Sequence, residues 1–168
     1  MSLRPHSPSE PVEVLRSELV QLDGRLCLRN ADVPFTGVMI EVYPDGSPKT
    51  RSRLREGRLE GPSTGFYPDG EVQVQEMFVE GVSHGARIKW HPNGVKASEA
   101  VIRDGQLHGL FRRWYENGVL AEEIEMRHNQ PDGQASIYYP SGFLKVRART
   151  SKGEVVDRTT WSDGETQG

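Results

Sequence analysis

Hydrophobic and polar residues alternate in short stretches along most of the chain. The stretch "EVQVQEMFV" at 71–79 has apolar side chains at Val72, Val74 and Phe78, with polar residues between them. Because successive side chains of a strand point to opposite faces, a period of two predicts strands rather than helices. Glycine (18) and proline (11) are frequent among the 168 residues, as in proteins with many short strands and turns. The pattern therefore predicts an all-β fold.

Glycines recur at intervals of 24 residues and divide the chain into equal units. Three series share this spacing: Gly37, Gly61, Gly85, Gly109 and Gly133; Gly46, Gly70, Gly94, Gly118 and Gly142; Gly57, Gly81, Gly105, Asn129 and Gly153. Asn129 fits its series because asparagine tolerates a left-handed backbone better than most residues. Five repeats of one backbone pattern are therefore expected between residues 37 and 156.

Each unit contains a turn sequence such as "YPDG", "HPNG" or "YENG". Proline fixes φ at one turn position, Asp or Asn tolerates the next, and glycine supplies a positive φ. We expect a β-hairpin in every unit, with tips at 44–46, 68–70, 92–94, 116–118 and 140–142. Together the units predict an elongated, single-layer antiparallel sheet of 24-residue hairpin repeats.

The two ends of the chain depart from the repeat. Residues 1–10 are expected to be a disordered leader, and residues 11–36 an N-terminal cap with a lead-in hairpin around "DGRLCLRN". Residues 157–168 are expected to be a truncated C-terminal repeat and tail that has lost its first strand. Atypical terminal units are what capping a repeat array requires.

A three-residue turn sets a definite register within each hairpin. Phe66 would then lie opposite Val72, Trp114 opposite Leu120, and Tyr138 opposite Leu144. On this register one face is apolar, with Val74, Phe78, Ile102, Ile124, Met126 and Val146 beside the Phe66 and Trp114 positions. The other face is expected to carry a row of Tyr43, Tyr67, His91, Tyr115 and Tyr139 together with the charged side chains.

Charge and cysteine content limit the functional classes. The formal net charge is −3, whereas a nucleic-acid-binding protein usually has an excess of basic residues. The sequence also has no run of Lys and Arg residues of the kind that binds an anionic membrane surface. The lone Cys27 fits a reducing compartment, and no apolar stretch resembles a signal peptide or a membrane span. We expect a cytoplasmic protein that binds neither nucleic acid nor membrane.

The sequence offers only weak evidence for a catalytic or metal-binding site. His84 and His108 occupy equivalent repeat positions, but such positions are two strands apart, about 10 Å, whereas zinc lies about 2 Å from each ligand. "GPSTG" at 61–65 lacks the strand-to-helix setting of a nucleophile elbow. The sequence predicts no catalytic, cofactor or metal site, and hence no enzyme.

The repeats resemble those of a known family. "EGPSTGFYPDG", "HGLFRRWYENG", "PFTG" at 34–37 and the alternation of "YPDG" with "REG", "VEG" and "RDG" resemble the MORN repeat. The likeness is to the bacterial variant found in the YwqK-like antitoxin family, and it covers about residues 20–164. It implies a protein-binding module that neutralises a cognate toxin by occlusion. The alternative, implied by other MORN arrays, is a structural scaffold or membrane-adjacent assembly protein.

The expected partner surface is the tyrosine row, because tyrosine offers a broad contact and a hydroxyl at low entropic cost. Its residues are Tyr43, Tyr67, His91, Tyr115 and Tyr139, with Arg51, Arg53, Glu99, Glu123 and Arg147 setting the partner's orientation. The competing interpretation is that the aromatic rows are structural. A second copy of the chain, giving a homodimer, is one candidate for covering the apolar face; residues 11–22 and sheet twist are the others.

Overall fold

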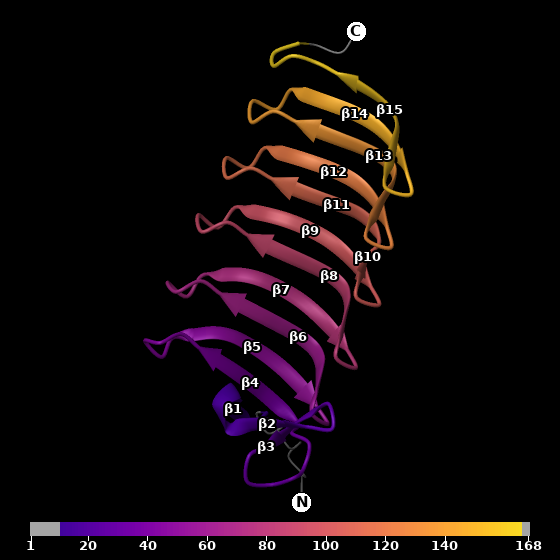
Figure 1. Ribbon diagram of the computed structural model, residues 1–168. Coiled ribbons are helices and arrows are strands. Elements are labelled where there is room, and N and C mark those ends of the chain that lie inside the picture. Colours follow the sequence, from indigo (N-terminus) through magenta and orange to yellow (C-terminus); the bar gives the residue numbers. More distant parts are fainter. Residues whose placement is uncertain (1–10, 166–168) are drawn as a thin grey trace, which may run out of the picture.

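The computed structural model describes residues 11–165 and confirms the predicted all-β fold. Within this range the repeat strands and the N-terminal strand β1 (Glu13–Leu15), which pairs parallel to β4, form one 13-stranded sheet whose hairpins are stacked one above another in a single layer (Figure 1). The repeat strands are β4 (Gly37–Val42), β5 (Pro48–Arg55), β6 (Arg58–Phe66), β7 (Val72–Val79), β8 (Val82–Trp90), β9 (Lys96–Arg103), β10 (Gln106–Leu107), β11 (Gly109–Trp114), β12 (Leu120–Arg127), β13 (Gln130–Tyr138), β14 (Leu144–Ser151) and β15 (Glu154–Thr160). Only β10 lies off the main path, paired with β9.

The hairpin tips lie at the predicted positions, along the left-hand edge of the array in Figure 1. The register at each tip is also confirmed, with Phe66 opposite Val72 and Trp114 opposite Leu120. Gly94 has a φ of 78°, and its N–H donates to the carbonyl of His91 at 2.9 Å. The turn therefore needs glycine for its left-handed backbone, as the sequence indicated.

A β-bulge follows each tip and was not predicted. Phe66 pairs with Val72, but its neighbour Gly65 pairs with Val74, so Gln73 is one extra residue in its strand. Adjacent residues of a strand point to opposite faces, so Phe66 and Val74 lie on opposite faces. The prediction that they share a face is wrong. The same shift occurs in all five repeats, at Glu41/Val42, Gly65/Phe66, Lys89/Trp90, Arg113/Trp114 and Ile137/Tyr138.

The paired residues define two faces of the sheet. The apolar face carries Leu54, Phe78, Ile102 and Met126, whose cross-strand partners include the glycines of the first series. The charged face carries one continuous cross-strand row: Ile40, Arg51, Thr64, Gln75, Ile88, Glu99, Arg112, Glu123, Ser136, Arg147 and Thr159.

Two-residue turns join successive hairpins along the other edge, called here the base edge (right-hand side of Figure 1). In these turns both central residues have positive φ, as in Glu80–Gly81 at 49° and 85°. This is the type I′ geometry that suits the twist of hairpin strands. Asn129 stands in for glycine with a φ of 66°, as its sequence position predicted.

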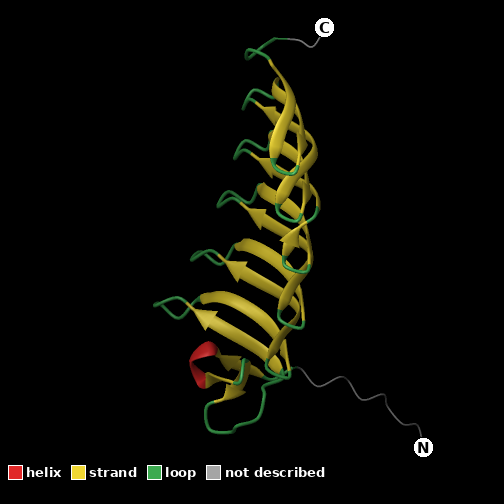
Figure 2. Ribbon diagram, turned by 45° about the vertical axis from the view of Figure 1, so that its right-hand side comes forward, coloured by secondary structure: helices red, strands yellow, loops and turns green. Residues whose placement is uncertain are grey.

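The N-terminal segment packs on the apolar face of the first hairpin. It comprises β1 (Glu13–Leu15), a short 3-10 helix (Arg16–Glu18), β2 (Leu19–Leu22) and β3 (Arg25–Leu28). Leu19 and Phe35 pack against Met39 and Leu54, and Leu19 and Leu54 are only 1% exposed. Figure 2 shows this segment at the foot of the array, with the other hairpins above it in a single layer. The core is therefore concentrated at the N-terminal end.

The C-terminal strand corrects one expectation. β15 pairs with β14 and begins 24 residues after β13, so it takes the place of a first strand. The prediction that the last repeat lost its first strand is therefore wrong. The predicted leader at 1–10 lies outside the described residues. Within the described part of the chain, no helix is long and apolar enough to cross a membrane.

Candidate protein-binding surface

The tyrosine row links each hairpin to the next one. The hydroxyl of Tyr67 donates to the carbonyl of Trp90 at 2.7 Å, and Tyr115 donates to Tyr138 at 2.8 Å. The same bridge is made by Tyr43 to Phe66, by His91 Nε2 to Trp114, and by Tyr139 to Trp161. The row thus forms a hydrogen-bonded ladder along the tips, a structural role that the sequence interpretation had held as the alternative.

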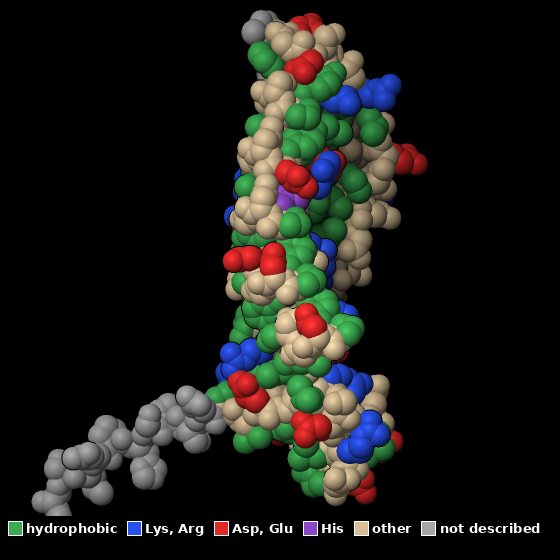
Figure 3. Space-filling view, turned by 90° about the vertical axis from the view of Figure 1, so that its left-hand side faces the viewer, with side chains coloured by type: hydrophobic (Ala, Val, Ile, Leu, Met, Phe, Trp, Pro, Cys, Tyr) green, Lys and Arg blue, Asp and Glu red, His purple; other side chains and the backbone are tan. Residues whose placement is uncertain are grey.

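Turn side chains add a second set of links between tips. Asn93 Oδ1 accepts from the N–H of Val95 within its own turn, and Asn93 Nδ2 donates to the carbonyl of Glu116 in the next hairpin at 2.8 Å. Asn117 does the same toward Val119 and Pro140. These links hold the tips in fixed relative positions. Figure 3 looks onto this edge, where hydrophobic side chains form a nearly continuous run.

Asp45 caps its own turn. Its Oδ1 accepts from the hydroxyl of Ser47 at 2.7 Å and from the Ser47 N–H at 2.9 Å. These hydrogen bonds, the hydroxyl first, lower the pKa of the Asp45 carboxyl.

The structure brings together four of the five predicted charged residues. Arg51, Glu99, Glu123 and Arg147 lie in the row of the charged face, in equivalent places of four hairpins, and Arg53 lies two residues nearer the base edge on the same face. The tyrosine row is not beside them. The bulges change the face to which the tip residues point. Tyr115 therefore lies on the same side as Arg113, whose guanidinium is 5.9 Å from the centroid of the Tyr115 ring. The expectation that both sets share one face is therefore wrong, while their role in binding stays a prediction.

The ion pairs on the charged face join side chains of the same strand or of nearby strands. Arg112 Nε lies 2.7 Å from Glu123 Oε2, Lys96 bonds Glu99 at 2.9 Å, and Arg51 pairs with Glu13 of β1. All are substantially exposed to solvent, so each contributes little to stability. Such charges are more useful for orienting a partner than for holding the fold.

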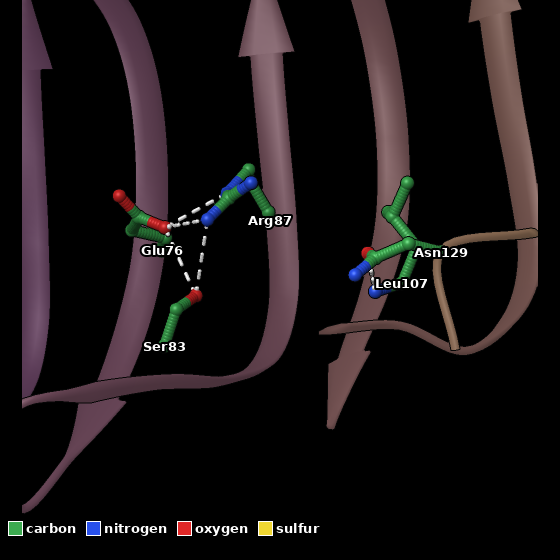
Figure 4. Close-up of polar contacts among 5 residues, drawn as sticks. All are labelled: Glu76, Ser83, Arg87, Leu107 and Asn129. Atoms are coloured by element: carbon green, nitrogen blue, oxygen red, sulfur yellow. Dashed lines mark hydrogen bonds and ion pairs between the residues drawn. The ribbon is translucent and has the colours of Figure 1, made fainter. Parts of the chain in front are cut away.

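The apolar face contains polar groups that the sequence interpretation missed. Arg87 lies opposite Glu76, and the two form a 2.8 Å ion pair that Ser83 joins (Figure 4). Arg113 bonds Glu122 at 2.6 Å, and this hydrogen bond raises the pKa of Arg113. These pairs need the bulged register, which the sequence spacing did not reveal. Figure 4 also shows Asn129 Oδ1 accepting from the N–H of Leu107 at 2.8 Å, another inter-repeat bond.

The four histidines within residues 11–165 do not converge on a common centre. His84 Nδ1 lies 3.4 Å from Asp104 Oδ1, and the rings of His108 and His128 meet edge to face at 5.8 Å. Residues 11–165 contain no group of three or more His, Cys, Asp or Glu side chains placed to hold a metal ion.

Comparison with known families identifies the repeat. The model of the MORN repeat variant matches residues 59–80 and 107–128, each of which covers one hairpin with its tip. The two matches begin 48 residues apart (107 minus 59), two periods of the array. No curated protein matches the chain. MORN repeats are in general non-catalytic modules that bind proteins or membranes. The matches and the fold support a MORN-repeat protein with a protein-binding role.

Proposed function

We propose that this protein is a cytoplasmic antitoxin or immunity-type protein, which binds a cognate toxin on the charged face of its array and blocks it by occlusion. The observation that carries the proposal is the cross-strand row from Arg51 to Arg147, which runs without interruption over all five hairpins. Occlusion needs a complementary surface and no chemistry, which suits a non-catalytic repeat.

Two physical features favour binding by this face. The charges of the row change sign along the array, from Arg51 through Glu99 to Arg147, so a partner is held in one register. The ladder of tip hydrogen bonds fixes the hairpins before the partner arrives, which reduces the entropic cost of binding. The toxin as partner rests on the resemblance of the repeats to the YwqK-like variant.

The test begins with a search for a toxin gene adjacent to the gene of this protein, and uses the product of such a gene as the candidate toxin. Its expression alone should stop bacterial growth, and co-expression of the wild-type chain should restore growth through a complex measurable by calorimetry. Reversing two charges of the row, Glu123→Lys with Arg147→Glu, should weaken the complex at least tenfold. The matched control, Glu116→Lys with Arg158→Glu, also leaves the net charge unchanged; it alters exposed residues outside the row and should bind as wild type. Failure of the wild-type chain to bind or rescue would refute the antitoxin role.

A further inference from the structure

Two of the five hairpin tips contain asparagine followed by glycine, at Asn93–Gly94 and Asn117–Gly118. Asparagine before glycine is prone to deamidation, because the backbone nitrogen of the next residue attacks the amide carbon and glycine has no Cβ to hinder that attack. Both asparagines are exposed to solvent. A Cβ added at Gly94 would meet no atom within 4 Å, so nothing crowds this tip. The chemistry needed for deamidation is therefore present at both tips.

The other tips show what each atom of the side chain does. The first two tips have Asp45 and Asp69 at the equivalent position. Asp69 Oδ1 accepts from the N–H of Glu71 at 3.0 Å, and Asn93 Oδ1 accepts from the N–H of Val95 at 3.1 Å. An oxygen at this place therefore closes the turn in either residue type. The link to the next hairpin needs a donor, and an ionised carboxylate has none.

Loss of the amide nitrogen would convert the link into a repulsive contact. Asn93 Nδ2 donates to the Glu116 carbonyl at 2.8 Å, and Asn117 Nδ2 donates to the Pro140 carbonyl at 2.9 Å. After deamidation to aspartate, a carboxylate oxygen would face each carbonyl oxygen in place of the donor. Two acceptors without a hydrogen between them repel, so the neighbouring tips would separate. The turn itself would persist, as it does with Asp69.

The folded tip holds the attacking nitrogen in a hydrogen bond. The N–H of Gly94 donates to the His91 carbonyl at 2.9 Å, and that of Gly118 donates to the Tyr115 carbonyl at 2.9 Å. The amide of Asn93 is likewise held at both Oδ1 and Nδ2. Attack on the amide carbon requires these bonds to open. Exposed turns open locally at a lower free-energy cost than the whole sheet, so the fold slows the reaction without preventing it.

We propose that Asn93 and Asn117 are deamidation sites of the native protein, and that their reaction, gated by opening of the tips, permanently cuts the links between the third, fourth and fifth hairpins. The inference goes beyond the antitoxin role and does not depend on it, because the links belong to the array itself and are measured on the isolated chain.

The reaction balances with water as its co-reactant. The backbone nitrogen of Gly94 forms a bond to Cγ of Asn93, the Cγ–Nδ2 bond breaks, and ammonia leaves with the proton of the Gly94 N–H. Water then opens the cyclic imide: cleavage of the new bond between nitrogen and Cγ gives aspartate, and cleavage at the backbone carbonyl carbon gives isoaspartate. Neither step needs an oxidant or a reductant. The same steps apply at Asn117 and Gly118.

Peptide mapping by mass spectrometry of the full chain, incubated at mildly alkaline pH, measures the reaction. Asn93 and Asn117 should convert to aspartate and isoaspartate, whereas Asn30 and Asn129, whose next residues carry side chains, should keep their amides. In urea, where the tips are open, conversion at the two tips should be about tenfold faster or more. Retention of both tip amides in the folded chain while the unfolded chain converts would overturn the proposal, as would equal rates in the two states.

Variants that carry the reaction product test the loss of the links. Asn93→Asp with Asn117→Asp should lower the midpoint of the thermal melt by several degrees, since two inter-hairpin hydrogen bonds become repulsive contacts. The control Gln21→Glu with Asn30→Asp adds the same negative charge at exposed positions outside the repeats and should melt as wild type. A wild-type melt for the tip variant would overturn the claim that deamidation cuts the links.

The second tip supplies the reciprocal experiment. Asp69→Asn gives this tip the Asn-Gly sequence of the third tip, and its new amide should donate to the carbonyl of Pro92, the equivalent of Glu116. The variant should melt at a higher temperature than wild type, and alkaline incubation should remove both the added amide and the added stability. A variant that gains no stability, or that keeps the gain after its added amide is lost, would overturn the proposal.

Discussion

Replacing Tyr67 and Tyr115 with phenylalanine should destabilise the array while keeping both aromatic rings. Each hydroxyl donates to a carbonyl of the next hairpin, at 2.7 and 2.8 Å, in a partly buried setting. One such hydrogen bond contributes about 0.5–1.5 kcal/mol. The two tyrosines are four strands apart, about 20 Å, so their effects should add. The double variant should therefore lose about 1–3 kcal/mol of unfolding free energy.

Urea unfolding followed by circular dichroism measures this loss, and thermal melts should fall by roughly 2–4 °C per kcal/mol for a domain of this size. The matched control is Tyr138→Phe, because the Tyr138 hydroxyl makes no hydrogen bond within the described residues and its ring lies at an equivalent tip. Wild-type stability in the double variant would refute the ladder. If binding to the partner fell while stability stayed unchanged, the row would be a recognition surface, as the sequence first suggested.

Three further predictions concern the turns, the N-terminal segment and membranes. Gly94→Val should destabilise by more than about 1 kcal/mol in a thermal or urea melt, since a β-branched residue is strained at a φ of 78°; a wild-type melt would contradict the turn geometry. Gly57→Ala should loosen the N-terminal segment and speed amide exchange at Leu26, because the added Cβ would lie 2.8 Å from the Leu26 carbonyl oxygen; unchanged exchange would show that the contact is not needed. Co-sedimentation with anionic vesicles at physiological salt should be negligible for want of clustered Lys/Arg, and strong binding would favour the membrane-adjacent alternative.

Much of the fold could be predicted because its determinants are local. Glycine and asparagine adopt a positive φ more readily than other residues, so the turn positions Gly94 and Asn129 can be recognised from the sequence. The spacing of such positions gives the length of the hairpin. The pairing of Phe66 with Val72 followed from the length of the turn. The C-terminal strand was misplaced because glycine-to-glycine spacing alone does not separate a first strand from a second.

The binding surface was harder to predict for a physical reason. The bulge at Gln73 does not alter the spacing of residue types along the sequence. It nevertheless places Phe66 on the opposite face of the sheet from Val74, so the faces of the aromatic pair are reversed relative to the rest of the strand. The tip hydrogen bonds likewise depend on the distance between hairpins. The exposed apolar residues Met77 and Val79 did carry a signal, since they stand where other repeats have arginine or glutamate. Comparison of the repeats position by position would have found it.

Hydroxyl-radical footprinting of the purified complex with the toxin tests most directly that the charged face is the binding surface. Methionines report on each region: Met77 on the charged face, Met126 on the apolar face, and Met39 in the N-terminal core as an internal reference. The account predicts that oxidation of Met77 falls on binding while oxidation of Met126 and Met39 is unchanged. Protection of Met126 with an unprotected Met77 would contradict it.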